Sequence, residues 1–238
     1  MTLTGKTALV TGGSRGIGRA VARRLAADGA RVVFTYQRAK DAAELLAAEI
    51  GATAVRCDQA DLDTLPAIFE PVRDGLDILV NNAGIAVQQP IAELTAAEFD
   101  RVLTINTKFP LFALQAAIPL LPDGGRVVNI STLNTAVAGP GLALYCASKA
   151  ALEQVTSVAA RELGPRGITV NTVSPGATDT DMLRAVNTPQ ALERAAGLTA
   201  LGRLGQPSDV ASVVAFLAGP DGAWITGQNL RATGGLMI

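Results

Sequence analysis

The sequence predicts an α/β fold: a doubly wound parallel sheet of about seven strands with helices on both faces. Three observations lead to this class. Short apolar runs rich in β-branched residues alternate with helical patterns along the chain, a glycine-rich turn follows the first strand, and 238 residues with 49% hydrophobic content can fill one large core. Because no linker-like stretch, repeat or low-complexity tract divides the chain, we expect a single domain over residues 1–238.

The predicted elements follow from apolar periodicity and from turn residues between the runs. Thr95 and Glu98 form a capping-box pattern at the start of one long helix, and Gly164-Pro165 ends another. The weakly periodic segment 181–206 is interpreted as a substrate lid. Strands are expected at 7–11, 31–36, 54–57, 78–81, 126–131 and 168–173 and near Asn229, and helices at 16–28, 40–50, 61–73, 95–121, 143–163 and 207–218.

Charge and composition exclude several classes of partner. The net charge is −1 and the basic residues are scattered, which disfavours nucleic acid. Mean hydropathy is +0.31, but charged residues, Gly or Pro interrupt every apolar stretch before roughly 18 residues, which disfavours a membrane. The first strand begins by Lys6 or Thr7, which leaves no room for a signal peptide, so we expect a cytoplasmic location. Cys57 and Cys146 lack C-x-x-C spacing, and no metal-ligand cluster is visible.

The chain has no histidine, so proton transfer must use Tyr, Lys, Cys or carboxylate groups. Tyr145 and Lys149 stand four residues apart in an Ala-rich helical run and should project from one helix face. A phenol ionises near pH ~10, and an adjacent ammonium would favour the phenolate and lower that pKa. The pair therefore can form an acid–base catalyst, although a solvated surface pair has the same spacing.

The turn after the first strand has the composition of a dinucleotide loop. Glycines let the main chain approach a pyrophosphate closely, and the following helix N-terminus offers unpaired N–H groups. The alternative is a purely structural strand-to-helix turn. The expected cofactor contacts in this turn are Gly12, Ser14, Arg15, Gly16, Ile17 and Gly18.

The end of the second strand indicates which cofactor is bound. Around Tyr36 and Arg38 there is no acidic residue to bind the 2′-hydroxyl of NAD, whereas Arg15 and Arg38 could meet the 2′-phosphate of NADP. We therefore expect NADP(H), with NAD possible; the alternative is that both arginines are only solvated. Asp58, just past the third strand, could accept a hydrogen bond from the adenine amino group.

Four motifs occur in an order that resembles the single-domain short-chain dehydrogenases/reductases, with a Rossmann-type fold. The likeness covers essentially the whole chain and is strongest to members similar to 3-oxoacyl-acyl-carrier-protein reductases. The motifs are Thr11-Gly12-x-x-x-Gly16-x-Gly18, Asn81-Asn82-Ala83-Gly84, Tyr145-x-x-x-Lys149 and Pro175-Gly176.

This resemblance implies roles for individual residues. Tyr145 would exchange the proton, and Lys149 would lower the pKa of Tyr145 and hold the nicotinamide ribose. Asn106 matches the family's helix asparagine, and Pro110 cannot donate to the carbonyl of residue 106, which would be free to hold a water unless Pro110 only kinks the helix. Matching positions beside the cofactor are Asn82, Ala83, Gly84, Ile130, Pro175, Gly176, Thr178 and Thr180.

Three positions depart from the family pattern. Thr132 stands where the family has a substrate-binding serine, and it keeps the hydroxyl while adding a methyl group. Ser131 is the fallback, disfavoured because neighbouring strand residues point to opposite faces. Thr178 replaces an isoleucine, and Thr233 replaces an acidic residue.

The function expected from these residues is reversible hydride transfer between NADP(H) and a carbonyl or secondary alcohol, with a ketone or 3-oxoacyl substrate. Thr132 and Tyr145 would polarise the oxygen. Two alternatives remain: a non-catalytic protein that senses a cyclic dinucleotide, because biofilm-regulating relatives share stretches like Phe34-Thr35-Tyr36, and a structural subunit. The resemblance also implies a homo-oligomer, a dimer or a homotetramer, with a small-molecule substrate as the other partner.

Overall fold

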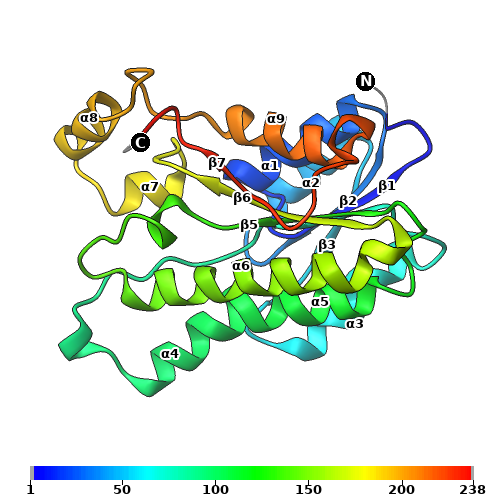
Figure 1. The fold of residues 1–238 in the computed structure, drawn as a ribbon, viewed down its shortest axis with the longest axis horizontal. Helices are drawn as coiled ribbons and strands as arrows, with labels where there is room; N and C mark the ends of the chain where they lie inside the picture. Colours follow the sequence, from blue (N-terminus) through cyan, green and yellow to red (C-terminus); the bar gives the residue numbers. More distant parts are fainter. Residues whose placement is uncertain (1–2, 237–238) are drawn as a thin grey trace.

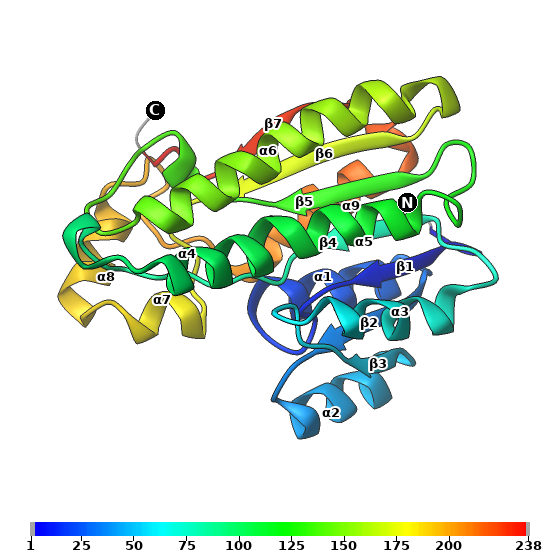
Figure 2. The same ribbon diagram turned by 90° about the horizontal axis from the view of Figure 1, so that it is seen from below.

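Seven parallel strands form one sheet in the order β3-β2-β1-β4-β5-β6-β7, in a computed structural model that describes residues 3–236. Figure 2 shows these strands side by side, with β3 at one edge and β7 at the other. The order changes direction at β1, so a crevice is expected at the carboxyl ends of β1 and β4. The strands are β1 (Thr7–Val10), β2 (Arg31–Tyr36), β3 (Thr53–Arg56), β4 (Ile78–Asn81), β5 (Arg126–Ile130), β6 (Thr169–Pro175) and β7 (Asn229–Ala232).

The helices cover both faces of the sheet (Figure 1). Alternate strand residues supply the two halves of the core: Ala8 and Val10 pack with the helices of one face, and Leu9 packs with those of the other. One face carries α1 (Gly16–Ala27), α2 (Lys40–Ile50) and α9 (Pro207–Ala218), and the opposite face carries α3 (Leu65–Phe69), α5 (Phe109–Ala117) and α6 (Ala143–Leu163). The predicted class, a doubly wound parallel sheet, is confirmed.

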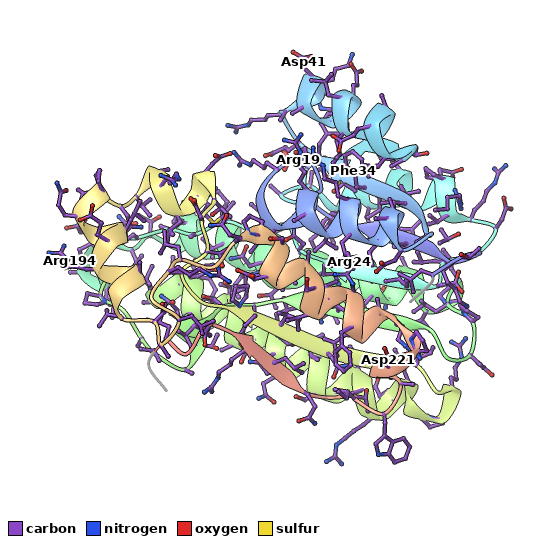
Figure 3. The ribbon with its side chains drawn as sticks, turned by 90° about the horizontal axis from the view of Figure 1, so that it is seen from above. Arg19, Arg24, Phe34, Asp41, Arg194 and Asp221 are labelled. Atoms are coloured by element: carbon purple, nitrogen blue, oxygen red, sulfur yellow. The ribbon has the colours of Figure 1, made fainter. Side chains whose placement is uncertain are left out.

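Helices α1 and α9 lie side by side above the sheet in Figure 3, although they are almost 200 positions apart in the chain. The labelled Arg24 of α1 reaches α9, where its Nη1 donates to Ser212 Oγ at 3.2 Å. Helices α1 and α9 therefore pack together in the layer on one face of the sheet.

The prediction of one continuous helix over 95–121 is wrong. This stretch consists of α4 (Ala96–Leu103), a π-helical turn η4 (Thr104–Lys108) and α5, which ends at Ala117. The proline at position 110 has no N–H, so the regular hydrogen-bond ladder cannot pass through it and the helix widens one turn earlier. The predicted capping box is only half present: Thr95 Oγ1 accepts the N–H of Glu98 at 3.2 Å, while the Glu98 carboxylate bonds to Arg101 instead.

The helix predicted over 61–73 is also divided, because prolines at 66 and 71 each remove a donor. It comprises η1 (Leu62–Thr64), α3 and η2 (Glu70–Val72), and other short helical turns are η3 (Ile91–Glu93), η5 (Leu133–Thr135), η6 (Gly164–Arg166) and η7 (Pro220–Gly222). The remaining boundaries agree with the predictions to within two residues. None of the helices between residues 3 and 236 is both long and apolar enough to cross a bilayer. The cytoplasmic location stays a prediction.

The segment predicted as a lid, 181–206, carries two helices, α7 (Asp181–Ala185) and α8 (Pro189–Gly197), beyond the carboxyl ends of the strands (Figures 1 and 2). The labelled Arg194 of α8 lies at the opposite end of the molecule from Asp221 (Figure 3). Ion pairs stand near both ends of this segment: Arg184 with Asp179 at 2.6 Å and Arg203 with Asp209 at 2.6 Å.

The C-terminal chain supports the same segment. The N–H of Leu201 donates to the carbonyl of Gly234 at 3.1 Å. A Cβ atom at Gly235 would lie 2.6 Å from the Cβ of Ala200, so only glycine fits this approach. Residues 234 and 235 therefore pack against the segment that follows α8.

Candidate active site

The glycine-rich turn between β1 and α1 has a backbone conformation that depends on its glycines. Gly12 and Gly16 have φ angles of +68° and +54°, which glycine adopts without strain. The N–H of Gly12 donates to Thr35 Oγ1 at 3.0 Å, which ties the turn to β2. A Cβ at Gly18 would lie 2.2 Å from the Gly12 carbonyl oxygen, so this approach of helix and loop requires glycine.

The start of α1 can bind an anion. Arg15 occupies the N-cap position without making a side-chain cap, so the N–H groups of the first helical turn have no cap acceptor. Ser14 is buried, Ile17 is half-buried and Arg15 is exposed at this turn. Position and chemistry fit the pyrophosphate of a dinucleotide.

The segment after β4 is tied to the same turn by a reciprocal set of hydrogen bonds. Thr11 Oγ1 accepts the N–H of Asn82 at 3.0 Å and of Ala83 at 3.1 Å. Asn82 Nδ2 donates back to the carbonyl of Thr11 at 2.9 Å and of Gly12 at 3.2 Å. The Asn82-Ala83-Gly84 segment therefore forms the second wall of the crevice at the point where the strand order changes direction.

A basic cavity of about 320 Å³ opens at the ends of β2 and β3. Its lining holds three cationic side chains and no acidic one. Arg56 was missed by the sequence analysis; it is in register with Tyr36 across β2 and β3, a contact that the predicted strand order could have suggested. Lys40 was missed too, and its Nζ lies 3.5 Å from Glu44. The lining residues are Tyr36, Gln37, Arg38, Lys40 and Arg56.

Asp58 follows β3 in the sequence, two residues after Arg56, which lines this cavity. Its Oδ1 accepts the N–H of Ala60 at 3.0 Å, and its carbonyl accepts from Thr64 Oγ1 at 2.9 Å. The carboxylate is half-buried, and its second oxygen has no hydrogen bond to the described residues. The proposed contact with an adenine amino group stays a prediction.

Lys149 is buried between the end of β5 and the segment after β4, with 3% of its surface exposed. Its Nζ donates to the carbonyl of Ile130 at 2.7 Å. A Cβ built at Gly84 would lie 3.2 Å from this Nζ and 3.0 Å from Asn106 Oδ1, so the glycine leaves the space that both side chains use. Burial lowers the pKa of Lys149 to about 8, against an opposing effect of Glu153.

Asn106 is fixed by its neighbours within the π-helical turn η4. Its Oδ1 accepts the N–H of Ile85 at 2.9 Å, and its Nδ2 donates to the Ile85 carbonyl at 2.9 Å and to Ser148 Oγ at 3.0 Å. Ser148 stands beside Lys149 on α6, so the predicted convergence of Asn106 with the helix of Tyr145 and Lys149 is present. The role of Ser148 was missed, because a serine between two motif residues gives no distinguishing sequence signal.

Tyr145 and Thr132 lie next to each other. Burial raises the pKa of Tyr145, and a side-chain hydrogen bond with Thr132 opposes this rise. The Lys149 ammonium donates to the Ile130 carbonyl, and burial is the largest cause of the Tyr145 shift, so a lowering of this pKa by Lys149 stays a prediction. The hydroxyl of Ser131, the fallback, is engaged elsewhere: its Oγ donates to Glu153 Oε1 at 2.5 Å.

The loop after β6 approaches the glycine-rich turn between β1 and α1. Thr178 Oγ1 donates to the Gly176 carbonyl at 3.0 Å, and Thr180 Oγ1 caps α7 by accepting the N–H of Leu183 at 3.3 Å. The Cγ2 atom of Thr180 lies 3.4 Å from the Cβ position of Gly16, so this loop contacts the phosphate turn. Pro175 is buried as the last residue of β6, directly before this loop.

The described residues therefore bring a phenol, a hydroxyl and a buried ammonium to one crevice whose floor can bind phosphate. Such an arrangement can polarise a carbonyl oxygen and supply a proton to it. No group of three or more His, Cys, Asp or Glu side chains that could hold a metal ion occurs between residues 3 and 236.

Comparison with known proteins identifies the family. The profile described as Enoyl-(Acyl carrier protein) reductase matches residues 12–237. The chain belongs to the short-chain dehydrogenase/reductase family. It is 48% identical to the cyclic-di-GMP-binding biofilm dispersal mediator protein of Escherichia coli, over 94% of each chain, and 40% identical to the 3-oxoacyl-acyl-carrier-protein reductase FabG of Staphylococcus aureus, over 98% of each.

A solved structure shares the whole fold. The blue fluorescent protein from a metagenomic library, crystallised in complex with NADPH, superimposes with a TM-score of 0.95 at 42% identity over 100% of both chains. The matching family model and the Staphylococcus aureus relative are both named as reductases. The chain is therefore an oxidoreductase of the short-chain dehydrogenase/reductase family.

Proposed function

We propose that this oxidoreductase uses NADPH to reduce a ketone or 3-oxoacyl substrate to the secondary alcohol, reversibly. The observation that carries the proposal is the pairing of Tyr145 with Thr132 beside the buried Lys149. Those groups match what carbonyl reduction needs: two donors to the oxygen and a nearby positive charge as negative charge develops.

NADPH fits the residues of the crevice. The uncapped start of α1 would receive the pyrophosphate, and Arg38, Lys40 and Arg56 would meet the 2′-phosphate in the basic cavity. When bound, the nicotinamide supplies the hydride. The absence of an acidic residue from the cavity lining supports NADPH over NADH.

The protein's own side chains account for the proton. Thr132 Oγ1 accepts the N–H of Asn134 at 3.2 Å, which leaves its own O–H to donate toward a carbonyl oxygen. The Tyr145 phenol is protonated at neutral pH, since its ordinary pKa is about 10 and burial raises that pKa further, and it donates the proton that converts the developing alkoxide into the alcohol. Asn106 and Lys149 keep the opposite side of the site in place through Ile85 and Ile130.

The test is NADPH oxidation with a panel of ketones, quinones and β-ketoacyl thioesters, for the wild type and for Tyr145→Phe. We expect turnover by the wild type and a loss of roughly 100-fold or more in kcat for the variant, because the proton donor is removed. NADPH affinity, measured by fluorescence titration, should change by less than about threefold. A variant that retains turnover contradicts the role of Tyr145.

A second candidate is a nucleotide-sensing protein that binds cyclic di-GMP. It is favoured by the 48% identity to a relative of that name and by the basic cavity, which would suit a second phosphate ligand. Calorimetric titration with cyclic di-GMP, with and without saturating NADPH, separates the two. Tight binding without carbonyl turnover supports sensing, and turnover without binding supports catalysis alone.

We also propose that the protein is a homo-oligomer, a dimer or tetramer. Large apolar side chains are exposed on the outer helices, including Phe99 on α4, Leu111 on α5 and Val158 on α6. Trp224, the sole tryptophan of the chain, is 98% exposed in the single chain. Light scattering gives the number of subunits, and a blue-shifted Trp224 emission would place this residue at an interface.

A further inference from the structure

Glu153 is a half-buried carboxylate on α6, one helical turn beyond Lys149, and it collects hydroxyl groups from three other segments. Its Oε1 accepts from Ser131 Oγ at 2.5 Å, from Thr135 Oγ1 at 2.8 Å and from Ser174 Oγ at 3.5 Å. Ser131 follows β5, Thr135 is the last residue of η5, and Ser174 belongs to β6. One oxygen atom thus links the helix to three points beneath the crevice.

The segment that these hydrogen bonds fasten carries Thr132, whose hydroxyl is proposed to bind the substrate carbonyl. Thr132 lies between Ser131 and Thr135, and Thr135 Oγ1 is also 3.0 Å from the Thr132 carbonyl. Tyr145 and Lys149 stand on the same helix as Glu153. The carboxylate therefore fixes the position of Thr132 relative to the phenol and the ammonium without contacting a substrate.

Glu153 is also the charge that acts on Lys149. Its negative charge opposes the burial that lowers the pKa of Lys149. Tyr145 on α6, Asn106 on η4 and the Ile130 carbonyl on β5 all meet the site as neutral groups. Around Glu153 the neighbours are hydroxyls, and the exposed Arg231 on β7 is in register with Ser174.

We propose that Glu153 is a positioning residue that fastens the Thr132 segment to α6 and keeps Lys149 in its ammonium form. An ammonium buried this deeply is otherwise disfavoured, because low-dielectric surroundings penalise the charged form. A carboxylate one turn away lies close enough to compensate part of that penalty. The catalytic consequence of this role rests on the proposed carbonyl reduction, but the effect on Lys149 does not.

The first experiment titrates Lys149 directly by NMR of protein labelled with ¹³C-lysine, with Lys149→Met to assign the signal. In Glu153→Gln, which keeps the shape and removes the charge, we expect the Lys149 midpoint to fall by roughly half to one pH unit. Glu153→Asp should stay nearer the wild type. The matched control Glu162→Gln, which removes an exposed charge from the same helix, should change nothing. An unchanged midpoint in Glu153→Gln overturns the proposal.

The second experiment measures kcat/KM for ketone reduction as a function of pH. In Glu153→Gln the pH at which kcat/KM falls on the alkaline side should be lower than in the wild type, by the same number of pH units as the NMR midpoint. The KM for NADPH should stay within about threefold of the wild-type value. A uniform loss of activity with an unshifted pH profile and a lower Tm shows a merely structural role and also overturns the proposal. If no carbonyl is reduced by the wild type, the proposed function fails while the NMR titration still decides the role of Glu153.

Discussion

Replacing Lys149 by methionine should abolish activity and yet make the protein more stable. Lys149 is buried, and its pKa is lowered to about 8 from an ordinary value of 10.5. The folded protein therefore holds an ammonium that would be better solvated in the unfolded chain. Methionine has a similar length and is apolar, so it can fill the same space without that penalty.

The size of the effect follows from the two pKa values. The pKa of Lys149 falls from 10.5 in the unfolded chain to about 8 in the folded protein, and each pKa unit corresponds to about 1.4 kcal/mol. At neutral pH, burying the ammonium therefore destabilises the folded state by roughly 3 kcal/mol. The variant also loses the hydrogen bond from Nζ to the Ile130 carbonyl, which costs about 1 kcal/mol. The net gain in the free energy of unfolding should be about 2 kcal/mol, or roughly 4–8 °C in Tm for a chain of this length.

The gain in the free energy of unfolding of Lys149→Met over the wild type must shrink as the pH rises. Below pH 8 the lysine is protonated in both the folded and unfolded states, so the wild type bears the full penalty. Between about pH 8 and 10.5 the unfolded chain keeps a proton that the folded state has lost, so wild-type stability rises with pH. Above 10.5 both states are neutral, and the advantage of methionine should disappear.

The assay is urea unfolding at fixed protein concentration, at pH 7 and at steps up to pH 10.5, followed by circular dichroism. Lys108→Met, at an exposed lysine on η4, is the matched control and should change stability by less than about 0.5 kcal/mol. A Lys149→Met variant less stable than the wild type at pH 7, or a gain that does not vary with pH, would refute the reasoning.

Three further predictions concern the cofactor and the substrate hydroxyl. Arg56→Ser should raise the KM for NADPH about tenfold and leave that for NADH unchanged, because only NADPH carries the 2′-phosphate; equal effects on both would remove Arg56 from the phosphate site. Thr132→Val should lower kcat by about 100-fold and Thr132→Ser by less than about threefold, because only the hydroxyl is needed; similar kcat values for the two would contradict that role. Gly18→Ala should weaken NADPH binding and lower stability by about 1–3 kcal/mol, because its methyl would lie 2.2 Å from the Gly12 carbonyl oxygen. Gly197→Ala, where a methyl meets nothing within 4 Å, is the control.

The sheet and the main site could be predicted because the signals are local. Apolar β-branched runs locate every strand to within two residues, and the spacing of Tyr145 and Lys149 identifies the helix that carries both. The glycine turn was also readable from sequence, since Gly18 permits an approach that a side chain would block. In each case a short stretch of chain contains the physical reason.

The missed features depend on contacts between distant segments. Glu153 is an ordinary helix residue by sequence, and its importance arises from hydroxyls supplied by β5, η5 and β6. Arg56 acquires a role only because β3 lies beside β2. The long helix over 95–121 was predicted as continuous because its apolar pattern persists across Pro110, whereas the backbone hydrogen bonds do not.

The contact between Gly234 and Leu201 has a practical consequence for anyone who expresses this protein. Gly234 braces the segment that follows α8, beyond the carboxyl ends of the strands (Figure 1), where the proposed substrate entrance lies. A purification tag fused there would sit against that brace and change how the entrance moves. A tag at the other terminus, near the amino ends of the strands, would leave the entrance untouched.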